Sequence, residues 1–401
     1  MPPQISTAVN RPAVPWDGAA VTAEVDVRPG TDRAASRARH VALVVDTSGS
    51  MGGEKIAKAR EGAAWVFGLL EPDDYVTIVS FDAEAAFVMR PTRWAETDRE
   101  EAMTAVDGLT AGGGTDMYDG LETAGEALRS IGRRSDGDDA VRRILLLSDG
   151  KDNTHEPEDF ERLAEDLDGM GIRIRSAGIG EDYNQDTIRT LGTTARGEWT
   201  HLEAAGDIES FFGDAVEAAS EVVATDAQLE VDVAPGVEIT DVYRALPQAQ
   251  EADLTWEDNT AVVKLPDLTE RDHQRVTMKV HAPAMEGSGS EHHILADLRL
   301  GARGAETTGA FTVEYTDDNA RLAQNNAEVD LDHRQTVVST ELGRGNVEAA
   351  ETHVEKMTRI HGADTQAVQE AERQTELVKE GGRAEQNRAT KIVADDEGRT
   401  R

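Results

Sequence analysis

One carboxylate and two hydroxyl side chains share a short segment, Asp46-Thr47-Ser48-Gly49-Ser50, that begins at the last residue of an apolar run at 40–46. All three of these side chains offer oxygen atoms, and two of them are uncharged. Mg²⁺ prefers about six oxygen ligands at ~2.0–2.1 Å and commonly keeps several waters. The segment therefore predicts a site for a small, hard divalent cation.

Two further loops offer oxygen ligands in a similar setting. Gly112-Gly113-Gly114-Thr115-Asp116 supplies the Thr115 hydroxyl before a predicted helix, and Leu147-Ser148-Asp149-Gly150 supplies a carboxylate at the end of a strongly apolar run. Open α/β sheets bind ligands outside the carboxyl ends of their strands. Taken singly, these residues would be read as helix caps and turns. Their combination in three loops favours a metal site.

The elements that must position these loops alternate between strands and helices from about residue 39 to 220. Apolar runs predict strands at 40–46, 75–81, 143–149, 172–179 and 198–203. Helical spacing predicts helices at 53–70, 97–107, 116–132, 157–168, 184–191 and 207–220. A shorter strand after residue 84 is expected to end at Pro91. This alternation is typical of an α/β fold with a doubly wound, mainly parallel sheet and helices on both faces.

The segments on either side of this α/β domain have a different pattern. Evenly spaced strand-like runs at 224–315 predict an antiparallel β-sandwich. Two strand-like runs within residues 1–30 lack a partner in the α/β plan, and an isolated hairpin is only marginally stable. We therefore expect residues 1–30 to pair with the sandwich, so that an α/β domain at 37–220 is inserted in it. Residues 317–395 predict a tail of three or four short helices.

Composition limits the function. The chain has 401 residues, with 78 acidic against 41 basic side chains and a formal net charge of −37. This charge disfavours binding to nucleic acid or to an anionic membrane surface. Thiol catalysis, disulfides and thiolate metal sites are excluded because there is no cysteine. The sequence contains no run of about 18 apolar residues, so no membrane-spanning helix is predicted. No secretory signal is visible either, and we therefore expect a cytoplasmic protein.

The basic residues are mostly arginine, since only eight of the 41 are lysine. Together with the many carboxylates, this resembles the protein composition of salt-loving archaea. The physical interpretation is an anionic surface that stays soluble when counterions screen its self-repulsion. An acidic protein from an ordinary habitat is the alternative.

The three loops also carry a family resemblance. DTSGSM (46–51), GGGTDM (112–117) and LLLSDG (145–150) are similar, in the same order, to the motifs of von Willebrand factor type A (VWA) domains with a metal-ion-dependent adhesion site. The resemblance covers about 37–220 and implies a divalent metal, with Mg²⁺ preferred and Mn²⁺ or Ca²⁺ as alternatives. It implies that Ser48, Ser50 and Thr115 coordinate through hydroxyls, and that Asp46 and Asp149 act directly or through water.

The wider arrangement, with sandwich strands around the domain and a helical tail, resembles prokaryotic relatives of calcium-activated chloride channel and inter-alpha-trypsin inhibitor heavy-chain proteins. The resemblance implies a non-enzymatic adaptor. A partner's Asp or Glu carboxylate would replace an exchangeable water on the metal, because five protein groups with only two carboxylates leave the cation under-neutralised. One alternative is the non-ATPase VWA subunit of a chelatase-like or remodelling motor complex. Another is a hydrolase, which would need a base close to Thr115.

Other candidate sites are better explained without a ligand. The glycine-rich loop lacks the G-K-[ST] ending of a phosphate-binding loop. His281, His292 and His293 show no H-E-x-x-H pattern, so surface histidines are expected rather than a zinc site. An acidic loop that contains Asp136, Asp138 and Asp139 has no EF-hand pattern, so we expect it to be solvated rather than a calcium site.

Overall fold

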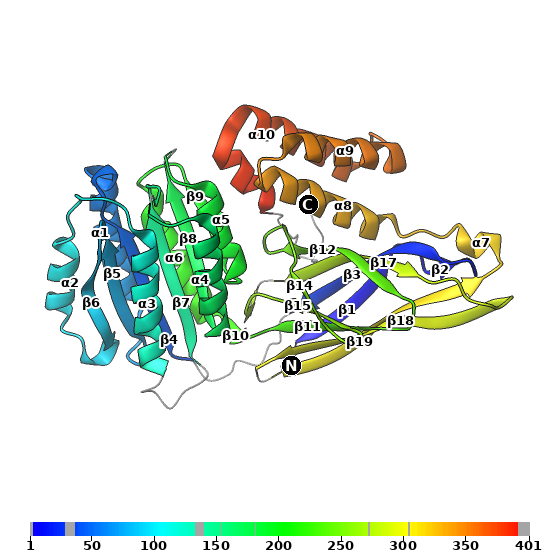
Figure 1. The fold of residues 1–401 in the computed structure, drawn as a ribbon, viewed down its shortest axis with the longest axis horizontal. Coiled ribbons are helices and arrows are strands. Elements are labelled where there is room, and N and C mark those ends of the chain that lie inside the picture. Colours follow the sequence, from blue (N-terminus) through cyan, green and yellow to red (C-terminus); the bar gives the residue numbers. More distant parts are fainter. Residues whose placement is uncertain are drawn as a thin grey trace. The chain divides into compact units, whose positions relative to one another are not determined.

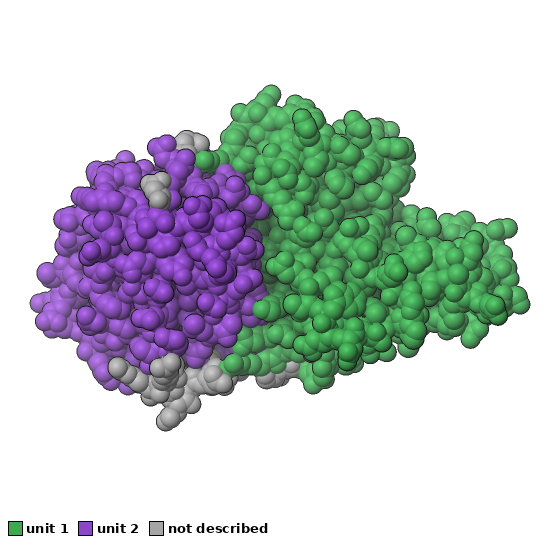
Figure 2. All heavy atoms as spheres, in the orientation of Figure 1, with its two compact units in different colours: residues 1–32, 226–401 green, residues 33–225 purple. Residues whose placement is uncertain are grey.

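A computed structural model describes residues 3–28, 37–132, 140–152, 154–180, 182–271, 273–303 and 305–391. The acidic loop with Asp136, Asp138 and Asp139 lies outside the described residues, as do residues 392–395 of the predicted tail and 1–2 and 29–30 of the N-terminal segment. The chain divides into two compact units, coloured separately in Figure 2. One is formed by residues 33–225, and the other by residues 1–32 together with 226–401.

The unit at 33–225 is built on one six-stranded sheet with the order β6-β5-β4-β7-β8-β9. Its strands are β4 (Arg39–Asp46), β5 (Tyr75–Phe81), β6 (Ala85–Arg93), β7 (Val141–Ser148), β8 (Ile172–Ile179) and β9 (Glu198–Leu202). All neighbouring pairs are parallel except β5 with β6, which is antiparallel. A short strand β10 (Val222–Ala224) follows near the end of the unit.

Helices cover both faces of this sheet (Figure 1). One core contains α1 (Glu54–Leu69), α2 (Arg99–Asp107) and α6 (Asp207–Ser220), and the other contains α3 (Met117–Gly132), α4 (Pro157–Gly169) and α5 (Gln185–Thr194). Two short 3-10 helices, η1 (Gly49–Met51) and η2 (Trp94–Glu96), follow β4 and β6.

The central strand β4 shows why the sheet is buried on both sides. Val41, Leu43 and Val45 pack with the α1, α2 and α6 core, whereas Ala42 and Val44 pack with the α3, α4 and α5 core. Successive side chains of a strand point to opposite faces, so a continuous apolar run suits a central parallel strand. The chain runs from β4 to β5 on one side and later returns to β7 on the other. The carboxyl ends of β4 and β7 therefore form the switch point where such sheets bind ligands.

The edge strand β6 differs from the expectation. The sequence predicts that this strand ends at Pro91, but β6 continues to Arg93. Its pairing with β5 shifts register between Val76 and Ile78, and Pro91 lies in the irregular stretch between paired Met89 and Thr92. A proline is tolerated because it lies on an edge strand at a bulge, where its missing N–H need not join the ladder.

The second unit contains two mainly antiparallel sheets. The first has the order β1-β3-β17-β12-β13 and contains β1 (Gln4–Val9), β3 (Ala19–Arg28), β12 (Glu238–Leu246), β13 (Gln250–Glu251) and β17 (Gln274–Ala282). The second has the order β14-β15-β11-β18-β19-β2 and contains β2 (Ala13–Val14), β11 (Gln228–Val233), β14 (Leu254–Glu257), β15 (Thr260–Lys264), β18 (Ser290–Ala302) and β19 (Ala305–Thr316). A short strand β16 (Leu268–Thr269) precedes β17.

The N-terminal strands belong to these two sheets. β3 pairs antiparallel with β17, with Val25 opposite Val276, and β2 pairs parallel with β19. In the sequence, the α/β unit is therefore inserted between β3 and β11. The predicted fold class, a doubly wound α/β sheet inserted among antiparallel strands and followed by a helical tail, is confirmed.

The tail consists of α7 (Asn319–Leu322), α8 (Ala327–Gly343), α9 (Val347–His361) and α10 (Gln366–Thr390). Its apolar core includes Val338, Leu342, Ala350, Val354, Met357, Val368, Ala371, Val378 and Ala389. Asp330 connects α8 to the first sheet, since its Oδ1 accepts hydrogen bonds from the Thr22 hydroxyl and the Lys279 ammonium, both at 2.9 Å. α10 is kinked at Gly382, whose φ of 67° is a conformation that favours glycine.

Candidate metal centre

The loops after β4 and β7 are joined by a chain of hydrogen bonds through four of the five predicted ligands. Asp46 Oδ1 accepts from the Ser48 N–H at 2.8 Å. The Ser48 and Ser50 hydroxyl oxygens are 3.0 Å apart, and the Ser50 hydroxyl donates to Asp149 Oδ1 at 2.7 Å. Asp46 Oδ2 also accepts from the Ser148 hydroxyl at 2.6 Å. The structure thus brings Asp46, Ser48, Ser50 and Asp149 together at the carboxyl edge of the sheet.

Thr115 lies next to this chain, and among the described residues its hydroxyl makes no hydrogen bond to the four. A Cβ added at Gly150 would lie 3.2 Å from Thr115 Oγ1 and 3.4 Å from Asp46 Oδ2, so both oxygens border the same glycine. The loop before Thr115 is tied to the loop after β4 by a hydrogen bond from the Gly112 N–H to the Thr47 carbonyl at 2.8 Å. A side chain at Gly150 would therefore press on the Thr115 hydroxyl.

The two carboxylates of the centre and Ser48 are buried, whereas Ser50 and Thr115 reach the surface. Asp46 and Asp149 are at most 1% exposed, whereas Ser50 is exposed and Thr115 is half-buried. Burial raises the pKa of Asp46, hydrogen bonds from Ser148 and Ser48 lower it, and the charge of Asp149 raises it further. Two buried carboxylates beside neutral oxygen donors fit a divalent cation, whose charge would offset theirs.

Lys55 is a member of this centre that sequence reasoning missed. It lies in the first turn of α1, and its ammonium donates to Asp149 Oδ2. No pattern in the sequence indicates this pair, because the two residues are 94 positions apart. The lysine supplies a positive charge to a carboxylate whose side chain has no exposed surface.

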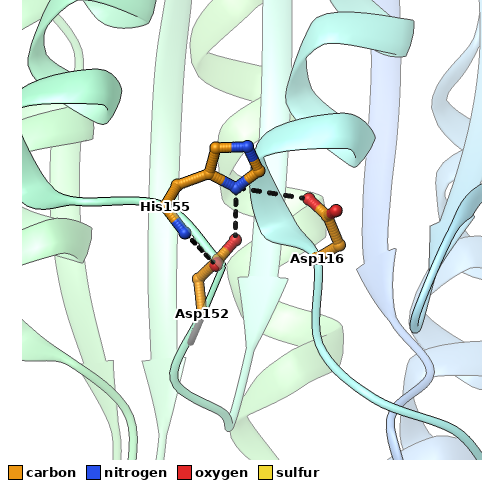
Figure 3. A group of neighbouring side chains, drawn as sticks. All are labelled: Asp116, Asp152 and His155. Atoms are coloured by element: carbon orange, nitrogen blue, oxygen red, sulfur yellow. Dashed lines mark hydrogen bonds and ion pairs between the residues drawn. The ribbon is translucent and has the colours of Figure 1, made fainter.

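A second group next to the centre contains Asp116, Asp152 and His155 (Figure 3). One ligand atom from each lies within 4.8 Å of the others. His155 Nδ1 is 3.7 Å from Asp116 Oδ1 and 3.6 Å from Asp152 Oδ2, and its ring stacks on Tyr118 with centroids 4.4 Å apart. Neither Asp152 nor His155 belongs to a motif that marks it as a ligand in the sequence.

The carboxylates of this second group hold the start of α3. Asp152 Oδ2 accepts from the N–H groups of Met117 at 2.9 Å and Tyr118 at 3.3 Å. Asp116 Oδ1 accepts from the Asp119 N–H at 3.0 Å. These bonds satisfy N–H groups of the first turn, which have no partner inside the helix. The group therefore acts as a helix cap that fixes the residues after Thr115.

Comparison with known proteins agrees with this fold. Residues 40–214 match the family model of the von Willebrand factor type A domain. A solved von Willebrand factor type A protein from Catenulispora acidiphila superimposes with a TM-score of 0.78 at 19% identity, covering 100% of this chain and 92% of that one. Residues 40–214 therefore match the von Willebrand factor type A domain in sequence pattern and in fold.

Curated relatives match over a smaller part of their length. An uncharacterized protein of Synechocystis is 26% identical over 243 residues, which are 60% of this chain and 56% of the relative. Inter-alpha-trypsin inhibitor heavy chain H3 of Mus musculus is 27% identical over 171 residues, which are 40% of this chain and 18% of the relative. Within the described ranges, no helix has both the length and the apolar character needed to cross a bilayer.

Proposed function

We propose that this chain is a non-enzymatic protein-interaction module that binds its partner through a divalent metal. The observation that carries the proposal is the continuous hydrogen-bonded chain Asp46–Ser48–Ser50–Asp149, with the Thr115 hydroxyl beside Asp46. The proposed site is a metal-ion-dependent adhesion site. The fold supports it, since β4 and β7 are neighbouring parallel strands and the Gly112 N–H donates to the Thr47 carbonyl in the loop after β4.

The donor set supports Mg²⁺ as the metal. Ser48, Ser50 and Thr115 offer neutral hydroxyl oxygens, and Asp46 and Asp149 offer carboxylates that would bind directly or through water. Hard oxygen ligands suit Mg²⁺, and Mn²⁺ is the closest substitute. With only two carboxylates, a bound cation would keep part of its positive charge and attract a further anion.

The exposed residues of the site indicate which chemical group of a partner would reach the metal. Ser50 is exposed, and so are Gly113 and Gly114 in the neighbouring loop, whereas both carboxylates are buried beneath. A group that approaches from this side meets neutral hydroxyls and backbone first. We propose that the partner contributes an Asp or Glu side chain, whose carboxylate completes the coordination of the metal.

The proposal can be tested on the full chain by calorimetric titration with MgCl₂ in concentrated KCl. We expect Asp46→Ala and Asp149→Ala to abolish Mg²⁺ binding, and Ser48→Ala to weaken it about tenfold. Ser210→Ala is the matched control, because Ser210 lies on α6 and its hydroxyl donates to the Asp207 carbonyl in its own turn. Wild-type protein that binds no Mg²⁺ would refute the metal site.

Partner binding is tested by capture from a cell extract at high salt, with Mg²⁺ or with a chelator. A specific partner should be retained only with Mg²⁺ and should be lost with Asp46→Ala. A partner that is retained equally in the chelator would contradict the bridging role of the metal.

A further inference from the structure

Lys55 and the metal would require the same carboxylate. The two oxygens of Asp149 have different partners, since Oδ1 accepts from the Ser50 hydroxyl at 2.7 Å and Oδ2 accepts from the Lys55 ammonium. The Asp149 side chain is fully buried, while that of Lys55 is 32% exposed. The ammonium also lies 3.8 Å from where a Cβ at Gly180 would be, which places it beside the end of β8 at the same edge of the sheet.

A neighbouring lysine on the same helix has a different environment. Lys58 follows one turn later on α1 and pairs with Glu61, whose side chain is 54% exposed. Such a surface ion pair contributes little to stability. The Lys55 pair is different because a buried carboxylate without a positive partner carries a large desolvation cost.

We propose that Lys55 is a built-in competitor of the metal, which lowers the Mg²⁺ affinity of the free domain and makes tight metal binding depend on the partner. This inference rests on the proposed function. Without metal, the ammonium neutralises Asp149. With metal, the same ammonium is a second positive charge close to the site and repels the cation. A partner carboxylate adds negative charge, which offsets both cations at once.

The test compares Lys55→Met with Lys58→Met in the full chain, by titration with MgCl₂ at fixed ionic strength. Methionine keeps a long apolar side chain and removes the charge. We expect Lys55→Met to tighten Mg²⁺ binding about fivefold to tenfold, because the repulsion is removed. Lys58→Met should bind as the wild type does. Lys55→Arg, which keeps the charge, should stay within about twofold of the wild type.

Thermal unfolding supplies a readout that does not depend on the partner. In a chelator, Lys55→Met should melt below Lys58→Met, because Asp149 is buried without a counter-charge. Saturating Mg²⁺ should remove this difference. Lys55→Gln serves as a second neutral variant if the methionine variant folds poorly.

The possible failures are distinguishable. If the wild type binds Mg²⁺ but Lys55→Met and Lys55→Gln bind it equally or more weakly, the competition is refuted while the metal site stands. If the wild type binds no Mg²⁺, the proposed function is refuted and the competition with it. Equal melting of Lys55→Met and Lys58→Met in the chelator would also overturn the inference.

Discussion

Thr115 differs from the other four proposed ligands in its surroundings. Asp46, Ser48, Ser50 and Asp149 are connected to one another by hydrogen bonds, whereas in the described part of the chain the Thr115 hydroxyl takes no part in those bonds. It lies on a loop with three successive glycines, which allows local movement. Thr115 is therefore the residue through which partner binding and metal binding can be separated.

We expect Thr115→Ala to lose partner affinity about tenfold or more, but Mg²⁺ affinity less than about threefold. The reason is that four ligands remain prearranged, while the hydroxyl needed to complete coordination beside the partner carboxylate is gone. Mg²⁺ titration and binding of the captured partner at saturating Mg²⁺ give the two affinities. Thr104→Ala is the control, since that hydroxyl donates to the Glu100 carbonyl within α2. Unchanged partner affinity in Thr115→Ala would refute the bridging metal.

Glu24 is a second single residue with a testable effect: its protonation changes the stability of the unit that contains the antiparallel sheets. It lies on β3, lines a cavity of about 530 Å³ and is near Arg275 and Asp332. The pKa of Glu24 is raised to about 7, mainly by burial and also by the charges of Asp332 and Asp26, against the lowering effect of Arg275. Between pH 4.5 and 7, the folded protein therefore keeps a proton that the unfolded chain has released.

The contribution of Glu24 to the free energy of unfolding is fully present below pH 4.5 and is lost as the pH rises through 7. The shift from 4.5 to about 7 corresponds to about 3–4 kcal/mol at ~1.4 kcal/mol per pKa unit. We expect Glu24→Gln to remove this loss, so that the variant gains stability relative to the wild type between pH 5 and pH 8. Urea unfolding of both proteins at pH 5 and pH 8 measures the difference between their free energies of unfolding. The pH effects of the other titrating groups are the same in both proteins and cancel in this difference. A difference that does not change with pH would contradict the raised pKa.

At the scale of elements, the start of α3 matters both for the stability of the fold and for the position of Thr115 in the proposed metal site. Its first N–H groups are held by Asp152 from the loop after β7 and by Asp116 from its own loop. Thr115 directly precedes this cap. Since α3 packs its buried residues against the central strands, the cap places Thr115 relative to the ends of β4 and β7.

We expect Asp152→Ala to destabilise the fold by about 1–2 kcal/mol, the usual cost of losing a helix cap. It should also weaken Mg²⁺ binding, by up to about threefold, because Thr115 directly precedes this cap and loses its anchor. Asp98→Ala is a matched control, since Asp98 caps α2 by accepting from Glu100 and Glu101. Urea unfolding and MgCl₂ titration test both effects. Equal Mg²⁺ affinity in Asp152→Ala and Asp98→Ala would show that the cap does not position the site.

At the scale of the whole molecule, the net charge of −37 dominates. Like charges on one folded chain repel each other, and salt screens the repulsion over a Debye length that shrinks from ~30 Å at 0.01 M to ~3 Å at 1 M. Unfolding moves these charges apart, so weak screening favours the unfolded chain. We propose that the protein is adapted to high salt.

We expect the melting temperature to fall by about 10 °C when KCl is lowered from 0.5 M to 0.01 M. That corresponds to a few kcal/mol at roughly 2–4 °C per kcal/mol for a domain of this size. Differential scanning calorimetry over this range measures the effect, and choline chloride at equal ionic strength should act as KCl does. A melting temperature that is independent of salt would contradict charge repulsion as the cause.

The amino-acid sequence by itself determined the class of the fold and the three loops of the candidate site. Apolar alternation and helical spacing are properties of neighbouring residues, so the strands ending at Asp46 and Ser148 and the helix beginning at Met117 could be predicted locally. The roles of the five proposed ligands remain predictions. Short-range patterns could also suggest that the N-terminal strands need partners elsewhere, but not that β3 pairs with β17 in one particular register.

Only the tertiary structure decided which distant groups meet at the site. The Lys55–Asp149 pair joins residues 94 positions apart, and the Asp152 cap on α3 reaches across 35 positions. Pro91 also lies within a strand because β6 is at the sheet edge, which local propensity cannot reveal. The physical reason is the same in each case. Contacts of this kind depend on how the sheet orders its strands, and that order follows from packing of the whole domain rather than from the residues on either side.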